Sequence, residues 1–180
     1  MLERRLLSAR AVSSEGRTLS GYAAVFNEPS TPLMDRRGEF IEYVQPGAFA
    51  ESIERGGQWA LWNHDAGEIL GRAPSTLQLR ETAKGLQFEL ELPNTTRGND
   101  VAELLRGGVL DGQMSFGFIV QRDAWSERGG SRVRHLEQVD LREISIVPEA
   151  AYPQTHSALR HGGWGWRHRR LRLARARSVR

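Results

Sequence analysis

The feature that most constrains the fold is a strict alternation of apolar and polar residues over positions 75–93. In "STLQLRETAKGLQFELELP", leucine or phenylalanine takes every second position on either side of Lys84 and Gly85. Successive side chains of a β-strand point to opposite faces of a sheet, so this period predicts two strands with one buried face each. We therefore expect an antiparallel hairpin here.

Strand patterns recur along the rest of the chain, whereas helical patterns are few. The other expected strands cover residues 17–27, 39–45, 58–65, 112–120, 123–138 and 139–148. "PGAFAESIERGG" predicts a short helix that starts at Pro46, and "NTTRGNDVAELLRGG" predicts a second one capped by Asp100. Because strands mostly follow strands, we expect a β-rich α+β domain of roughly seven strands, closed or sandwiched.

Composition narrows the class of protein. The 180 residues suffice for one domain with a core, and no uninterrupted apolar run is long enough to cross a membrane. "MLERRLLSARAVSSEG" does not resemble a secretory signal, because charges interrupt each apolar stretch. The chain has no cysteine, which excludes disulfides, thiolate metal sites and cysteine nucleophiles.

The net charge of +3 is unevenly distributed. Residues 160–180 hold eight arginines and no acidic residue, so residues 1–159 have 17 basic and 22 acidic side chains. The body of the protein is therefore mildly acidic, and the basic character belongs to the C-terminal tail. This distribution argues against a nucleic-acid-binding module as the role of the whole chain.

The strand "GQMSFGFIV" carries a candidate nucleophile, Ser115. Its apolar face is formed by Met114, Phe116, Phe118 and Val120. Ser115 and Gly117 point the other way, since side chains alternate along a strand. One interpretation is an ordinary solvent-facing strand, and the other is a nucleophilic hydroxyl with space cleared beside it.

Two more polar residues on apolar strands could complete a catalytic group with Ser115. A serine hydroxyl needs a base within hydrogen-bond reach, and histidine suits that role because it titrates near neutral pH. His64 is the candidate base, and Glu143 in "LREISIV" is the candidate acid that fixes its tautomer. Strict alternation puts Glu143 on one strand face with Leu141, Ser145 and Val147.

Each candidate also has an ordinary structural interpretation. His64 could be a histidine at a strand end beside a turn, and Glu143 could pair with Arg142 or Arg72. His135 and His156 compete with His64 and Glu143 for the base or the third position. The five histidines do not cluster and lack the spacing of a metal site, so we expect no metal and no cofactor.

Five blocks taken together resemble the prohead serine proteases of tailed bacteriophages. They are "LSGYAAVFN", "PGAF", "LWNHD" with "LGR" soon after, "LRGGVLDGQMSFGF" and "LREISIVPEAAYP". The blocks follow the order of that family and cover residues 17–156. Each block is weak alone, but a chance run of all five is improbable.

The resemblance implies a fold and a set of site residues. The fold would be that of the herpesvirus assemblins, a closed antiparallel-type β-barrel of about six to seven strands with a few short surrounding helices. The histidine of "WNHD" would be the base His64, and the serine of "MSFGF" the nucleophile Ser115. Assemblins use a second histidine as the third member. Here Glu143 is carried over, with Asp140 or His156 as alternatives.

The resemblance also implies a biological setting. The chain would be a serine endopeptidase that cleaves the scaffold segment of the major capsid protein, and itself, during maturation of a phage or phage-like prohead. It would act inside the immature capsid, in the cytoplasm of the host bacterium, and the likeness to assemblins implies a homodimer. No membrane partner is expected.

The division of the chain follows from these considerations. Residues 1–157 would form the protease domain, and residues 158–180 an arginine- and tryptophan-rich tail. The tail could place the protease inside the shell, bind nucleic acid or have no partner; we favour the first role and expect no nucleic-acid contact. The alternatives for the whole chain are a non-enzymatic structural or scaffold component of the capsid and a basic-tailed nucleic-acid-binding module.

Overall fold

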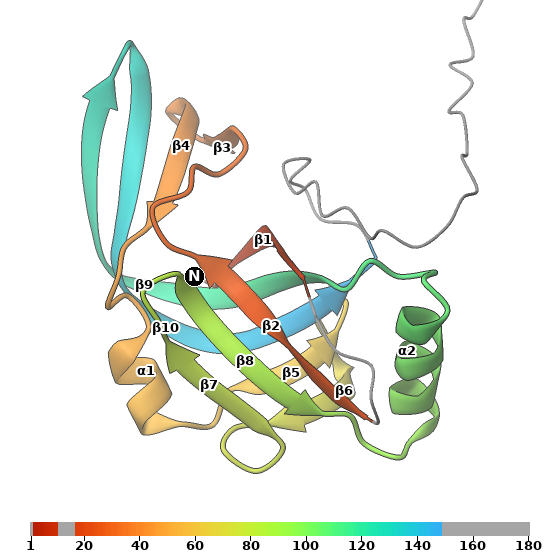
Figure 1. Cartoon of the computed structure of the whole chain (residues 1–180). Coiled ribbons are helices and arrows are strands. Elements are labelled where there is room, and N and C mark those ends of the chain that lie inside the picture. Colours follow the sequence, from red (N-terminus) through yellow and green to blue (C-terminus); the bar gives the residue numbers. More distant parts are fainter. Residues whose placement is uncertain (1, 11–16, 149–180) are drawn as a thin grey trace, which may run out of the picture.

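The computed structural model describes residues 2–10 and 17–148, and within them it contains ten strands and two helices (Figure 1). The elements are β1 (Leu2–Arg10), β2 (Thr18–Val25), β3 (Leu33–Asp35), β4 (Gly38–Val44), α1 (Ala50–Arg55), β5 (Trp59–Trp62), β6 (Asp65–Arg72), β7 (Leu77–Glu81), β8 (Gly85–Glu91), α2 (Thr96–Arg106), β9 (Gln113–Arg128) and β10 (Ser131–Val147). The expected boundary between domain and tail at residue 157 lies outside the described residues. Neither described helix is long and apolar enough to cross a membrane.

The larger sheet has seven strands and is built around β9 and β10. These two strands pair antiparallel along their length and turn at Gly129 and Gly130, which both have positive φ. β1 pairs antiparallel with the other edge of β9. The hairpin end of β9 and β10 projects from the body together with β3 and β4 (Figure 1).

The other edge of β10 is shared between two parallel partners. Residues 132–136 pair with β4, and residues 143–146 pair with β5. β3 then extends the sheet beyond β4, and β6 extends it beyond β5. β10 therefore connects two branches of the sheet, and β5 and β6 lie beside its C-terminal part.

The smaller sheet has three strands in the order β2-β8-β7 and lies across the larger one (Figure 1). It contains the hairpin expected at residues 75–93, now seen as β7 and β8. The apolar faces of the two sheets form one core, whose fully buried members include Leu77, Leu86, Phe88, Leu90, Met114, Phe116, Phe118 and Ile144. The alternation that predicted the strands thus also supplies the core.

The expectation of a closed barrel is wrong, and so is the number of about six to seven strands. The ten described strands form two sheets, and neither closes on itself. β10 divides its pairing between β4 and β5, so the larger sheet branches where a barrel would continue to a single next strand. The smaller sheet packs over the core by its face.

Both helices are where the sequence predicts them, but their starts differ. α1 begins at Ala50, and Pro46 lies in the turn before it. α2 is capped by Thr95, whose hydroxyl accepts a hydrogen bond from the backbone N–H of Gly98 at 3.2 Å. The expected cap, Asp100, lies inside α2.

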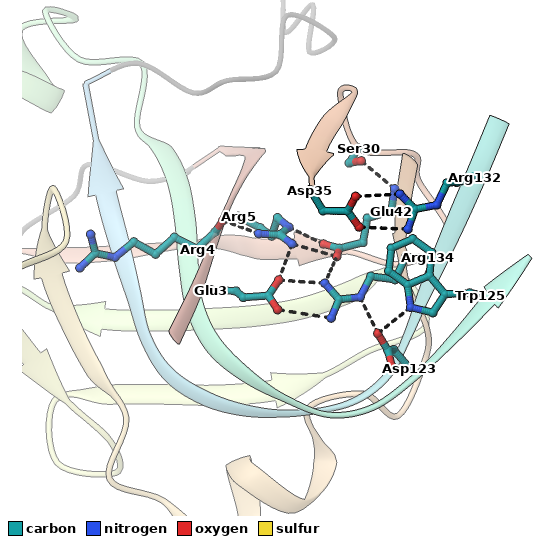
Figure 2. Close-up of polar contacts among 10 residues, drawn as sticks. All are labelled: Glu3, Arg4, Arg5, Ser30, Asp35, Glu42, Asp123, Trp125, Arg132 and Arg134. Atoms are coloured by element: carbon teal, nitrogen blue, oxygen red, sulfur yellow. Dashed lines mark hydrogen bonds and ion pairs between the residues drawn. The ribbon is translucent and has the colours of Figure 1, made fainter. Parts of the chain in front are cut away.

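A cluster of charged side chains links β1 to β4 and β10 within the larger sheet (Figure 2). Arg5 donates to both carboxylate oxygens of Glu42 on β4, at 2.5 and 3.0 Å, and Arg134 on β10 donates to Glu42 at 3.2 Å. Glu3 accepts from both guanidiniums, at 2.6 Å from Arg5 and 2.9 Å from Arg134. Burial raises the pKa of Glu42, and the two arginines oppose that rise.

Candidate functional site

His64 lies in the two-residue turn that joins β5 to β6. Asn63 and His64 both have positive φ, at 50° and 61°, as the tightest hairpin turns require. Asparagine and histidine are among the non-glycine residues that adopt this conformation most readily. The turn is anchored to β10, because Asn63 N–H donates to the carbonyl of Ile146 at 2.9 Å and His64 N–H donates to Ser145 Oγ at 3.2 Å.

The imidazole of His64 is oriented by Glu143 on β10. His64 Nδ1 lies 2.6 Å from Glu143 Oε1, and the two side chains are 12% and 7% exposed. Since an ionised carboxylate can only accept, Nδ1 carries the proton of this hydrogen bond. Nε2 is then the nitrogen that accepts a proton, and it is buried without a hydrogen-bond partner among the described residues.

A β-bulge at Arg142 turns Glu143 toward this site. Leu141 lies opposite Phe118 on β9, but Glu143 lies opposite Gly117, and Arg142 between them has no partner in the ladder. An extra residue in one strand shifts the alternation of its side chains by one. The expectation that Glu143 shares a face with Leu141 is therefore wrong.

Gly117 leaves the space that Glu143 occupies. A Cβ atom at position 117 would lie 2.2 Å from Glu143 Oε1. The sequence suggested that this glycine makes room for substrate, whereas the structure fills the room with the carboxylate. The second oxygen of that carboxylate, Oε2, accepts a hydrogen bond from Ser145 Oγ at 2.6 Å.

Ser115 lies on the same face of the sheet, directly across the ladder from Ser145. It is fully buried, so the interpretation of an ordinary solvent-facing strand is wrong. Its hydroxyl donates to the backbone carbonyl of Arg5 on β1 at 2.8 Å and is not bonded to His64 Nε2. The structure thus puts His64 and Glu143 in direct contact and places Ser115 on the same sheet face as Glu143, opposite Ser145.

The competing candidates lie elsewhere. His135 bonds Gln45 at 3.2 Å and stacks on Tyr43, in the projecting part of the larger sheet. Asp140 pairs with Arg55 and, at 2.7 Å, with Arg142. His156 lies outside the described residues.

The arginines considered as partners of Glu143 are engaged with other groups. Arg142 pairs with Asp140, and Arg72 stacks over the ring of Trp59 at 4.5 Å. Glu143 therefore has His64 and Ser145 as its partners.

Sequence reasoning missed two contributors to the cluster. Ser145 lies two residues after Glu143 in "LREISIV", where alternation puts both on one face, but the sequence did not single out its hydroxyl. Arg4 on β1 donates to the carbonyl of His64 at 3.4 Å. A strand at residues 2–10 was not expected, because its charges mask any apolar period.

Comparison with known proteins identifies the family of the chain. Residues 6–162 match the model of the caudovirus prohead serine proteases. The chain belongs to that family. Its members are the proteases that mature phage capsids, so the enzymatic class follows from the match. No curated protein matches the chain.

A solved structure has a similar fold. It is the capsid assembly protease gp21 of bacteriophage T4, with a TM-score of 0.53 and 7% sequence identity. The match covers 82% of this prohead protease and 97% of the T4 chain. At this low identity the likeness concerns the fold alone.

Proposed function

We propose that this chain is a serine endopeptidase in which Ser115 is the nucleophile, His64 the general base and Glu143 the residue that orients the base. The observation that carries the proposal is the 2.6 Å contact between His64 Nδ1 and Glu143 Oε1. It leaves Nε2 as the proton acceptor, and Glu143 lies on the sheet face that holds the buried Ser115. This division of the two ring nitrogens is the one that serine hydrolases use.

The reaction follows from these positions. Ser115 Oγ attacks the carbonyl carbon of the scissile bond while its proton passes to His64 Nε2. The imidazolium then gives that proton to the leaving amine, and the acyl-enzyme forms. Water attacks the acyl-enzyme with His64 again as base, which releases the acid product and returns the proton to Ser115.

One movement has to come before attack. The hydroxyl of Ser115 donates to the carbonyl of Arg5, so it must exchange that acceptor for His64 Nε2. Rotation about the Cβ–Oγ bond redirects the proton, and rotation about the Cα–Cβ bond also moves the oxygen. Glu143 stays in place during this step, because its two oxygens are bonded to His64 and Ser145.

The proposed substrate is the scaffold segment of the cognate major capsid protein, with the chain itself as a second substrate. The family match and the sequence blocks around His64, Ser115 and Glu143 support this choice. The enzyme would act inside the immature capsid, in the cytoplasm of the infected bacterium.

The test is to express the chain with the cognate major capsid protein and to follow both masses over time. Wild type should shorten the capsid protein, and Ser115→Ala and His64→Ala should leave it whole. Glu143→Ala should keep partial activity, because the acid orients the base without reacting. Ser52→Ala is the matched control: it removes another buried hydroxyl, which donates to the carbonyl of Phe49 in α1.

Two results would contradict the proposal. Cleavage by Ser115→Ala at the wild-type rate would remove Ser115 as nucleophile. Intact capsid protein and intact chains with wild type and every variant would favour the alternative, a structural component of the capsid.

A further inference from the structure

Ser145 holds two parts of the site at once. It is fully buried on β10, where its hydroxyl donates to Glu143 Oε2 at 2.6 Å and accepts from the backbone N–H of His64 at 3.2 Å. The proton and a lone pair of this single oxygen are therefore both engaged. The same oxygen atom thus bonds both the acid and the turn that carries the base.

The contact with Glu143 fixes how the carboxylate is turned. Oε1 must meet His64 Nδ1, and a buried carboxylate held through one oxygen could still rotate about its last bond. The hydrogen bond from Ser145 to Oε2 removes that freedom and solvates the second oxygen, which burial would otherwise leave unpaired. Charge-assisted hydrogen bonds of this kind are short and strong.

The contact with His64 fixes the other side of the pair. The N–H of His64 lies in a turn with positive φ, which needs support from its surroundings. By accepting from this N–H, Ser145 holds the turn at a set distance from the strand that carries Glu143. The acid and the turn that carries the base are thus both hydrogen-bonded to one oxygen atom, Ser145 Oγ.

Two buried serines face each other across β9 and β10, and their surroundings separate their roles. The hydroxyl of Ser145 donates its hydrogen bond to a carboxylate, so it does not donate to the free nitrogen of His64. The hydroxyl of Ser115 donates its hydrogen bond to a neutral backbone carbonyl, a weaker acceptor that it can leave more easily.

We infer that Ser145 is a positioning residue that fixes the carboxylate of Glu143 and the turn of His64, and that it is not a second nucleophile. The inference rests on the proposed function, because it assigns Ser145 a role in the same reaction. Ser145 acts on the position of the base, so loss of the Ser145 hydroxyl should lower turnover more than it weakens substrate binding.

The test compares Ser145→Ala, Ser145→Thr and Ser52→Ala in the full chain on a peptide cut from the capsid protein. Ser145→Ala should lower kcat by about 10- to 100-fold with KM nearly unchanged, as expected for the loss of one hydrogen bond to a charged group. Ser145→Thr keeps the hydroxyl and should recover most of the rate. Ser52→Ala should match wild type.

A second readout reports on position without activity. The proton between His64 Nδ1 and Glu143 should give a low-field resonance in the proton NMR spectrum, assigned by its loss in His64→Ala. Ser145→Ala should shift or broaden this signal, whereas Ser145→Thr and Ser52→Ala should preserve it. If wild type proves inactive as a peptidase, this signal still tests the positioning role separately.

Labelling with a fluorophosphonate distinguishes the two serines. Ser115 should carry the label, and Ser145→Ala should be labelled more slowly at the same residue. The inference is overturned if Ser145→Ala keeps wild-type kcat and an unchanged NMR signal, or if the label is found on Ser145.

Discussion

At the scale of single residues, the position of Glu143 depends on the missing Cβ atom of Gly117. Gly117 lies opposite Glu143, and any Cβ there would overlap the carboxylate oxygen that binds His64. Alternation predicted correctly that Ser115 and Gly117 share a face, but it could not show what fills the space beside the glycine. That information lies in the neighbouring strand, which is 26 residues further along the chain.

Gly117→Ala should therefore act through Glu143. The added methyl group must push the carboxylate from His64, so we expect kcat to fall about as far as in Glu143→Ala. The double variant should be no worse than Glu143→Ala alone, because effects that pass through one group are not additive. Kinetics of the three variants check this, and a wild-type kcat for Gly117→Ala would contradict it.

Asp35 gives a prediction on pH. Its carboxylate accepts two hydrogen bonds from Arg132, at 2.8 and 3.0 Å, which lowers the pKa of Asp35 to about 2 from its ordinary value of 3.8. A carboxyl with a lowered pKa in the folded state stabilises the fold above its unfolded pKa, and this contribution is lost as the pH falls toward 2.

The stability difference between wild type and Asp35→Asn should accordingly be constant above pH 4 or so and should vanish toward pH 2. Urea unfolding at several pH values measures it. An NMR titration of Asp35 in Arg132→Ala is the control, and its pKa should return toward the ordinary value. A pKa of Asp35 that is the same in both proteins would contradict the assigned cause.

At the scale of elements, local patterns predicted the strands better than their ends and their connections. The hairpin of β7 and β8 follows from alternation alone. β1 does not follow from alternation. Its charged residues Arg5 and Glu3 pair with residues of β4 and β10, which lie far away in the sequence. The bulge at Arg142 is equally hidden, because neither glycine nor proline marks it.

The residue that caps α2 differs from the residue that the sequence predicted as its cap. Asp100 followed by Glu103 resembles a capping box, but Thr95 holds the first turn. Thr95→Ala should lower the free energy of unfolding by about 1 kcal/mol, because it leaves a helix N–H without its acceptor. Asp100→Ala should change it by less than about 0.5 kcal/mol, as for an exposed site. Thermal or urea unfolding of both variants decides between the two caps, and equal losses would contradict the structure.

At the scale of the whole molecule, the closed barrel that the family resemblance implied is wrong, and the strand patterns could not correct it because they do not show which strand edges pair. β10 has two parallel partners on one side, β4 and β5, and their separation along the chain gives no sign of it. The family resemblance named His64 and Glu143, which lie in contact, but the barrel it implied is wrong, since each block carries its own side chains while sheet closure depends on all of them together.

The place of Ser115 and Ser145 within the larger sheet has a consequence for how the enzyme fails. β9 has neighbours on both sides, and so has β10, so backbone amides there should exchange with solvent only when the sheet itself comes apart. As denaturant is added, inactivation and global unfolding should then follow one curve. Ser115 and Ser145 would therefore keep their places until the whole sheet unfolds.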